Sequence, residues 1–237
     1  MKRPPPPPRR ASRHGATGAV RELLMFDLDG TLLDTRRDLA TAVNRMRQDY
    51  RLPPLPVATV AGYVGDGFRV LVRRALQKHR VPLDEAVARC ARHYRRHLAV
   101  ATRPYPGVPR GLARLQEAGF RLALISNKPT AACRRLVRHF GWARWLDAVT
   151  GGDSVSRLKP HPEALQHTLG LLDVPAGRAW MIGDHKTDLE AAQRAGIRSV
   201  FVTWGMGLRG GFRPARVFHS FDDLTAFFLR RAGAGPR

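Results

Sequence analysis

Two aspartates, Asp27 and Asp29, directly follow a short apolar run over residues 23–26. The run predicts a buried strand, and Gly30 after the acids predicts a tight turn. In an extended backbone the side chains at i and i+2 point to one side, and a turn at Gly30 would equally bring Asp29 towards the same ligand. Two carboxylates that close repel each other unless a cation or a proton lies between them. The pair therefore indicates a Mg²⁺ site or acid/base chemistry, with a solvated turn as the structural alternative.

Two further segments place residues that suit an anionic group before predicted helices. Ser126 and Asn127 follow the apolar run 121–125, so a hydroxyl and backbone N–H groups there can hold a phosphate. Ser126 alone is equally consistent with a simple helix cap. Lys159 follows the glycine-rich stretch 151–154 and stands just before a predicted helix, with a compact point charge on its side chain. A single lysine is nevertheless more often a surface charge.

A second acidic segment is laid out like the first. The apolar run 179–182 leads into Asp184, and Asp188 falls in the first turn of a helix expected near 187–195. His185 lies between the two acids. Because Mg²⁺ prefers oxygen ligands, we interpret His185 as a loop residue rather than a metal ligand.

These four segments resemble the motifs of the haloacid dehalogenase-like phosphohydrolases. Asp-x-Asp-Gly-Thr-Leu-x-Asp-Thr over 27–35 is similar to the family's first motif, and the other three follow in the family's order. The resemblance covers about residues 22 to 230 and implies Asp27 as nucleophile and Asp29 as general acid/base. It further implies phosphate binding by Ser126, Asn127 and Lys159, and Mg²⁺ held by Asp27, Asp29 (through its backbone carbonyl), Asp184 and Asp188.

The elements that must position these residues alternate between strands and helices. Alternation with short connections predicts a parallel sheet covered on both faces. The expected fold class is α/β, with a doubly wound Rossmann-like parallel sheet as core and a small inserted helical cap. After the first strand, strands are expected at 121–125, 147–150, 179–182 and 198–202, and helices near 108–118, 130–140, 161–172, 187–195 and 222–230.

Residues 36–103, which we call the cap, have helical patterns near 36–50, 67–79 and 84–99. An insertion after a strand stands over the ligand site of an open α/β sheet, so the cap is positioned as a lid. Thr35 and Asp38 have the spacing of a helix N-cap and its N3 partner. The cap holds fifteen Arg and Lys against five acidic residues, which suits a phosphate site.

The segments outside the cap divide into a core and two tails. The core is expected over 21–35 and 104–231. Residues 1–20 contain five consecutive prolines and five Lys or Arg without an acidic residue, which predicts a disordered basic proline-rich tail. Residues 232–237 are expected to form a flexible C-terminal tail.

Composition limits the function classes. A hydrophobic fraction of 43% supports a globular interior, and no apolar run approaches the roughly 18 residues of a membrane span. Only two cysteines, Cys90 and Cys133, are present, without metal-ligand spacing, so a reducing cytoplasmic location fits. The net charge of +22 favours anionic partners and leaves open a basic nucleic-acid-binding protein with an idle phosphatase site.

Closer features are similar to the phosphoglycolate phosphatases. They include Val64-Gly65-Asp66-Gly67 and Asn127-Lys128-Pro129, with Asp66 where that family usually has Asn. Asp66, His185 and Thr187 are departures from the family pattern. The resemblance implies Mg²⁺-dependent hydrolysis of 2-phosphoglycolate through an aspartyl-phosphate, with a pyrophosphatase or sugar phosphatase as the alternative. We expect a small-molecule phosphate ester as partner, neither a membrane nor nucleic acid, and a monomer or homodimer.

Overall fold

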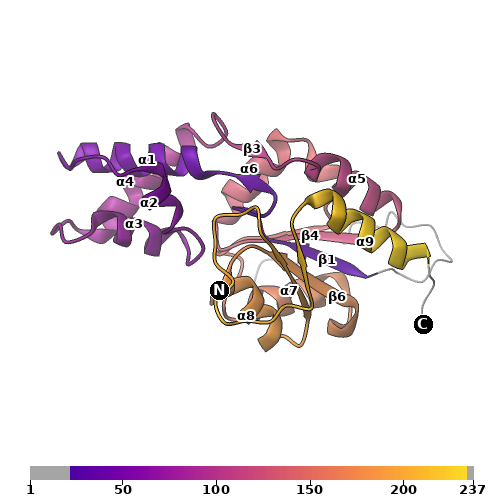
Figure 1. Cartoon of the computed structure of the whole chain (residues 1–237). Coiled ribbons are helices and arrows are strands. Elements are labelled where there is room, and N and C mark those ends of the chain that lie inside the picture. Colours follow the sequence, from indigo (N-terminus) through magenta and orange to yellow (C-terminus); the bar gives the residue numbers. More distant parts are fainter. Residues whose placement is uncertain (1–21, 234–237) are drawn as a thin grey trace, which may run out of the picture.

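The computed structural model describes residues 22–233 (Figure 1). The basic proline-rich tail expected over 1–20 lies outside the described residues, and so do residues 234–237. No helix over the described residues is long and apolar enough to cross a bilayer.

A parallel sheet forms the centre of the molecule within residues 22–233. Its first strand, β1, lies in the middle, so connections leave it towards both edges of the sheet. Phe26 of β1 pairs with Leu124 on one side and with Ile182 on the other. Such a switch point is where open α/β sheets bind ligands, outside the carboxyl ends of the strands. In sheet order the strands are β5 (Ala148–Thr150), β4 (Arg121–Ile125), β1 (Leu23–Phe26), β6 (Ala179–Gly183), β7 (Arg198–Val202) and β8 (Arg216–Phe218).

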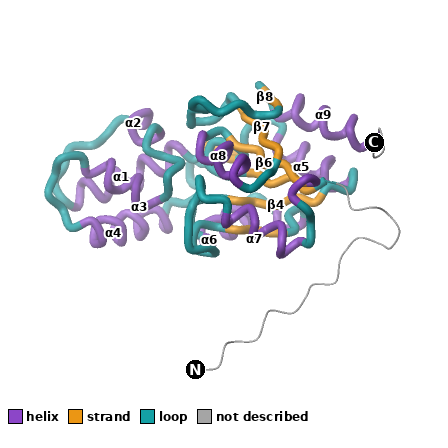
Figure 2. Tube along the Cα trace, turned by 90° about the horizontal axis from the view of Figure 1, so that it is seen from below, coloured by secondary structure: helices purple, strands orange, loops and turns teal. Residues whose placement is uncertain are grey.

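Both faces of the sheet are buried, which is why the strands read as continuous apolar runs. Alternate residues of β1 point to opposite faces. Leu24 and Phe26 belong to one apolar cluster, whereas Leu23 and Met25 belong to another. Helices contribute to each cluster from opposite sides (Figures 1 and 2). The first face is covered by α5 (Val108–Glu117), α6 (Thr130–His139) and α9 (Phe221–Gly233), the second by α7 (Glu163–Leu172) and α8 (Lys186–Arg194).

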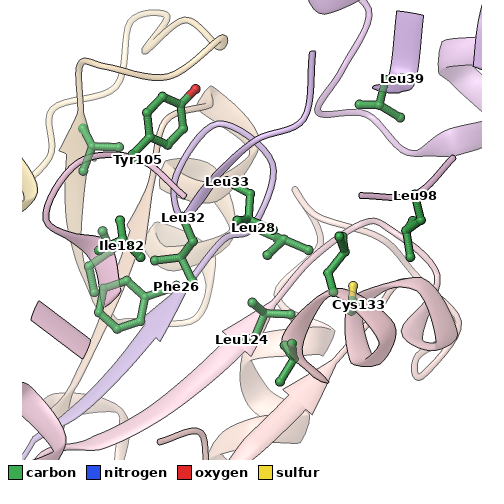
Figure 3. Close-up of a cluster of buried hydrophobic side chains, with 14 of the residues drawn as sticks. Phe26, Leu28, Leu32, Leu33, Leu39, Leu98, Tyr105, Leu124, Cys133 and Ile182 are labelled. Carbon is green, nitrogen blue, oxygen red and sulfur yellow. The ribbon is translucent and has the colours of Figure 1, made fainter. Parts of the chain in front are cut away.

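The cap is helical and lies to one side of the sheet in Figure 1. The chain enters it from β2 (Leu33–Asp34) and leaves it through β3 (Arg103–Pro104), and these two short strands form an antiparallel pair. Apolar side chains of the cap and the core form one continuous cluster, which contains Leu39 and Leu98 of the cap and Leu28 and Cys133 of the core (Figure 3). The cap helices are α1 (Arg36–Asp49), α2 (Val57–Ala61), α3 (Phe68–Leu76) and α4 (Leu83–Arg96).

The prediction of a capping interaction at the start of α1 is wrong. Thr35 makes no side-chain cap hydrogen bond and instead donates from its hydroxyl to Asp29 Oδ1, at 2.7 Å. The Asp38 carboxylate turns away from the helix end and accepts from the backbone N–H groups of Ala101 and Thr102 and from the Thr102 hydroxyl. Both side chains therefore tie distant segments together, because tertiary partners outweigh the local cap.

Most expected elements are present, and a few short ones were missed. The helix α2, the β2–β3 pair and the edge strand β8 were not expected, nor were two single 3₁₀ turns over Trp142–Arg144 and Ala176–Arg178. Each has five residues or fewer, which is too short for periodicity to reveal. The last helix, α9, continues to Gly233, two residues past the core boundary expected at 231.

Candidate active site

Three aspartates converge at the carboxyl ends of neighbouring strands. Asp27 directly follows β1, Asp184 directly follows β6, and Asp188 lies in the first turn of α8. Each offers one carboxylate oxygen, and these oxygens all lie within 4.8 Å of one another. All three side chains are buried. The cluster thus contains three of the four aspartates that the sequence analysis singled out as metal ligands.

Lys159 bridges two members of this cluster. Its Nζ donates to Asp27 Oδ1 at 2.8 Å and to Asp188 Oδ1 at 2.6 Å. A third hydrogen bond, at 2.9 Å, goes to the backbone carbonyl of Ile125, the last residue of β4. Burial alone would lower the pKa of Lys159, but the Asp188 and Asp27 carboxylates outweigh this and raise it. The ammonium is therefore charged and fully hydrogen-bonded beside the acidic cluster.

Asp29, the fourth aspartate, pairs elsewhere. Lys128 Nζ lies 2.7 Å from each Asp29 carboxylate oxygen, and the Thr35 hydroxyl donates to Oδ1. The Asp29 carboxylate is therefore not a member of the cluster of three. Lys128 also lies over the ring of Tyr94 from the cap helix α4, 4.8 Å from its centroid. Burial would lower the pKa of Lys128, yet Asp29 and Tyr94 together raise it.

Sequence reasoning did not assign a role to Lys128. The available signal was its place in Asn127-Lys128-Pro129, directly after the hydroxyl residue at the end of a strand. Its partner Asp29 lies 99 residues away along the chain, and only the adjacency of β1 and β4 brings the two together.

The loop after β4 contains a serine beside the acidic cluster and an asparagine whose side chain makes three hydrogen bonds. Ser126 lies next to the acidic cluster, and its hydroxyl oxygen accepts from the Lys128 N–H at 3.3 Å. The Asn127 side chain accepts from the Lys159 N–H and donates to the carbonyl oxygens of Lys159 and Gly65, all at 2.8 Å. Among the described residues, no acceptor bonds the backbone N–H of Asn127. The side chain thus positions Lys159, while the N–H remains available for an anion.

Burial makes the acidic cluster electrostatically unfavourable without a cation. Burial and the nearby Asp188 raise the pKa of Asp184 to about 6, against the lowering effect of its hydrogen bonds from Gly207, Met206 and Thr31. Burial also raises the pKa of Asp27, opposed by Lys159 and reinforced by Asp188 and Asp184. Two buried carboxyl groups with raised pKa values side by side make this place favourable for a positive charge.

Small residues let the backbone approach Asp184 closely. Gly30, at φ +94°, would place a Cβ 2.2 Å from Asp184 Oδ2. The Thr31 hydroxyl donates to Asp184 Oδ1, and the N–H groups of Met206 and Gly207 donate to Oδ2. These contacts hold the carboxylate in one orientation, which a metal ligand requires.

The departures from the family pattern have local explanations. The His185 ring caps α8 by accepting from the Thr187 N–H, and the His185 N–H donates to Asp188 Oδ2. His185 is thus a helix cap that orients Asp188. Burial lowers the pKa of its imidazole. Asp66 forms an ion pair with Arg74 at 2.6 Å and does not line the pocket, so its charge is compensated within the cap.

The acidic cluster opens into a pocket between the core and the cap. On the core side it is lined by the aspartates, both lysines, Ser126 and Asn127. On the cap side, the side chains are all apolar: Leu39, Val64, Phe68 and Leu71. Among the described residues no charged cap side chain lines the pocket. The arrangement combines carboxylates, two ammonium groups, a hydroxyl and a backbone N–H, which together suit phosphoryl transfer.

Comparisons with known proteins agree with this chemistry. The model of the family described as haloacid dehalogenase-like hydrolase matches residues 24–202. A phosphoglycolate phosphatase from Cupriavidus necator is 41% identical over 207 residues, covering 86% of this chain and 90% of that protein. A phosphoglycolate phosphatase from Neisseria gonorrhoeae is 38% identical, covering 78% and 81%. The crystal structure of a predicted phosphoglycolate phosphatase from Haemophilus somnus superposes with a TM-score of 0.83 at 28% identity, covering 90% of this chain and all of that one.

Proposed function

Because this chain belongs to the haloacid dehalogenase-like hydrolase family, we propose that it hydrolyses 2-phosphoglycolate to glycolate and inorganic phosphate with the help of Mg²⁺. It is a phosphoric monoester hydrolase of the phosphoglycolate phosphatase-like type, as its curated relatives at 36–41% identity are. The apolar cap face of the pocket suits a small substrate whose charges all meet the core.

The residues of the acidic cluster fit a divalent cation. Asp27, Asp184 and Asp188 are opposed by one ammonium, that of Lys159, which leaves two negative charges uncompensated in a buried site. All the donors are oxygens, the ligand type that Mg²⁺ prefers. We assign the ion to these three carboxylates, with the backbone carbonyl of Asp29 as a further ligand. When bound, Mg²⁺ supplies neutralisation of phosphoryl charge and orients the phosphate.

The chain's own residues then divide the reaction between them. Asp27 attacks phosphorus in line and forms an aspartyl-phosphate. Asp29 protonates the leaving oxygen and then removes a proton from the water that hydrolyses this intermediate. The Ser126 hydroxyl, the Asn127 N–H and the Lys159 ammonium hold the phosphoryl oxygens, whose charge is spread in the transition state. Lys159 already contacts Asp27 at 2.8 Å, so it stands beside the site of attack.

A single observation carries this proposal: the carboxylates at 27, 184 and 188 and the ammonium at 159 come from three separate segments and meet at one edge of the sheet. A structural ion-pair network would balance its charges, whereas this one does not. An excess of negative charge in a buried site favours the binding of a cation there.

Two further parts of the proposal concern organisation and location. We divide the described chain into a core and the cap over 36–103, which β2 and β3 join to it. We also propose a cytoplasmic location. The two cysteines, Cys90 and Cys133, are buried and free, which suits a reducing compartment.

The test is release of inorganic phosphate from a panel of esters at equal enzyme concentration, with Mg²⁺ and with a chelator. We expect 2-phosphoglycolate to give the highest kcat/KM, ahead of pyrophosphate and hexose phosphates. Preference for either of the last two would replace the substrate and keep the reaction class. No phosphate release from any ester, together with a salt-sensitive mobility shift of nucleic acid, would instead support a basic nucleic-acid-binding protein.

A further inference from the structure

The pocket holds one ammonium group that the reaction steps above leave without a task. Two lysines line the pocket among the described residues, Lys128 and Lys159. The Lys159 ammonium donates three hydrogen bonds, to Asp27, to Asp188 and to a backbone carbonyl. The Lys128 ammonium donates hydrogen bonds to both carboxylate oxygens of Asp29 and faces the Tyr94 ring. Its side chain is 5% exposed, so its charge acts in a largely dry environment.

A substrate with a carboxylate needs a cation other than those that hold its phosphate. The cap side of the pocket offers none, because its lining side chains are Leu39, Val64, Phe68 and Leu71. His185 lines the pocket, but its ring is engaged in capping α8, where Nδ1 accepts from the Thr187 N–H. Lys128 is therefore the cation available for a second anion.

Lys128 is also at the right place along the chain. It follows Ser126 and Asn127, the residues proposed to hold the phosphate, and its N–H donates to the Ser126 hydroxyl oxygen. In 2-phosphoglycolate the carboxylate is separated from the ester oxygen by a single methylene group. A phosphate held by this loop therefore brings the carboxylate close to the side chain of the next residue.

Asp29 must leave Lys128 before it can act on the leaving oxygen. Both of its carboxylate oxygens lie 2.7 Å from Lys128 Nζ. A buried ammonium without a carboxylate is costly, so Asp29 is released readily only when another anion takes its place. A substrate carboxylate satisfies that condition. A phosphate ester whose alcohol part carries no charge, called a neutral ester below, does not.

We propose that Lys128 binds the carboxylate of the substrate in exchange for Asp29, so that a carboxylated phosphate ester itself frees the acid/base. This inference rests on the proposed function and assigns to Lys128 the selection of substrate. The exchange keeps one ammonium–carboxylate pair in the site throughout. It favours carboxylated over neutral esters in binding and again in turnover.

The first test compares kcat/KM for 2-phosphoglycolate and 2-hydroxyethyl phosphate. The second compound is a neutral ester in the sense above and of similar size, with a hydroxymethyl group in place of the carboxylate. Lys128→Met is expected to lower the value for 2-phosphoglycolate by roughly 100-fold, the cost of losing a charged hydrogen bond. The value for the neutral ester should stay within a fewfold, so the preference disappears. The matched control is Lys186→Met, which removes an exposed lysine outside the pocket and should alter neither value.

Two outcomes would overturn the inference. Equal losses on both esters would make Lys128 a residue that only positions Asp29, and a preserved preference would remove it from carboxylate binding. Release of 4-nitrophenolate from 4-nitrophenyl phosphate in a single turnover needs folding and Asp27, but neither a proton for the leaving group nor hydrolysis of the aspartyl-phosphate. Comparing this rate between the wild type and Lys128→Met separates a loss of folding from a loss of carboxylate binding.

A binding measurement separates this inference from the proposed function. Calorimetric titration of the Asp27→Asn variant with 2-phosphoglycolate and with inorganic phosphate, in Mg²⁺, measures affinity without turnover. Adding Lys128→Met should weaken 2-phosphoglycolate binding by about tenfold or more and leave phosphate binding unchanged. If both ligands weaken equally, the inference fails even where the wild type hydrolyses 2-phosphoglycolate. If the wild type prefers another ester but this difference persists, only the substrate in the proposed function fails.

Discussion

The side-chain amide of Asn127 donates a 2.8 Å hydrogen bond to the carbonyl oxygen of Gly65, which joins the loop after β4 in the core to the cap. The same side chain exchanges two hydrogen bonds with the backbone of Lys159. Gly65 adopts φ +117°, a conformation that other residues rarely take, so its carbonyl is presented to Asn127 by a backbone that favours glycine. One amide therefore links the cap, the loop after β4 and Lys159, the lysine that bridges Asp27 and Asp188.

Replacing Asn127 by alanine should lower kcat for 2-phosphoglycolate by about 10- to 100-fold and destabilise the fold by about 2–3 kcal/mol, because two buried hydrogen bonds and one partly buried one lose a partner. The matched control is Asn44→Ala. Asn44 makes a similar pair of hydrogen bonds with the backbone of Leu55 inside the cap, away from the site. It should lower stability without lowering kcat, as measured by denaturant unfolding and steady-state kinetics. A similar fall in kcat for both variants would contradict a special role for Asn127.

Replacing Asp27 by asparagine removes the proposed nucleophile with little change in shape. Phosphate release should fall by about 10⁴-fold or more, since the covalent step is lost. The free energy of unfolding should not fall, because the variant removes one of three buried carboxylates that repel one another. Circular dichroism and thermal unfolding check the fold. Activity retained within tenfold of the wild type would exclude Asp27 as nucleophile.

Mg²⁺ binding should stabilise the protein more at pH 7.5 than at pH 5. The folded-state pKa of Asp184, about 6, lies above its ordinary value of 3.8, so the folded state binds the proton more tightly. In chelator, this carboxyl therefore contributes a loss of stability as pH rises from about 4 to 6. Above that window the carboxylate is free to bind Mg²⁺. Millimolar Mg²⁺ should raise Tm by about 3–6 °C at pH 7.5 and by less than half of that at pH 5.

The control for this pH effect is Asp184→Asn. It removes the carboxyl whose protonation competes with the metal, so the Mg²⁺-dependent rise in Tm should become small at both pH values. Phosphatase activity of the wild type should disappear in chelator and return with Mg²⁺. An unchanged Tm with Mg²⁺ at pH 7.5, or activity that persists in chelator, would contradict the metal assignment.

The carboxylate of Asp38 should matter for stability far more than its distance from the chemistry suggests. It is 2% exposed and accepts hydrogen bonds from Ala101 and Thr102 at the end of the cap. Asp38→Asn should cost about 2–3 kcal/mol in the free energy of unfolding, because an amide group would face backbone donors. Asp84→Asn, which removes a solvent-exposed ion pair with Arg69, should have no measurable effect. Equal effects in urea unfolding would refute this distinction.

The sequence predicted the parts of the site that follow apolar strands. Ser126, Asp184 and Asp188 could be located because the carboxyl ends of parallel strands meet at one edge, whatever the order of the strands. The pairing of Lys128 with Asp29 could not be predicted, since it depends on β1 and β4 being neighbours and on Asp29 turning away from the cluster.

Local rules failed where long-range partners were stronger. The spacing of Thr35 and Asp38 indicated a capping interaction, yet each side chain found a buried partner from another segment. The edge strand β8 has only three residues, of which two are exposed, so no apolar run marks it. Such elements become visible only when the rest of the sheet is in place.

Leu33 and Pro104 are paired residues in the β2–β3 pair, so the chain leaves the core and returns to it at neighbouring positions. Lengthening, shortening or exchanging the intervening helices would leave the separation between β1 and β4 untouched. The apolar wall over the pocket can thus change in shape while the carboxylates and ammonium groups of the core keep their arrangement.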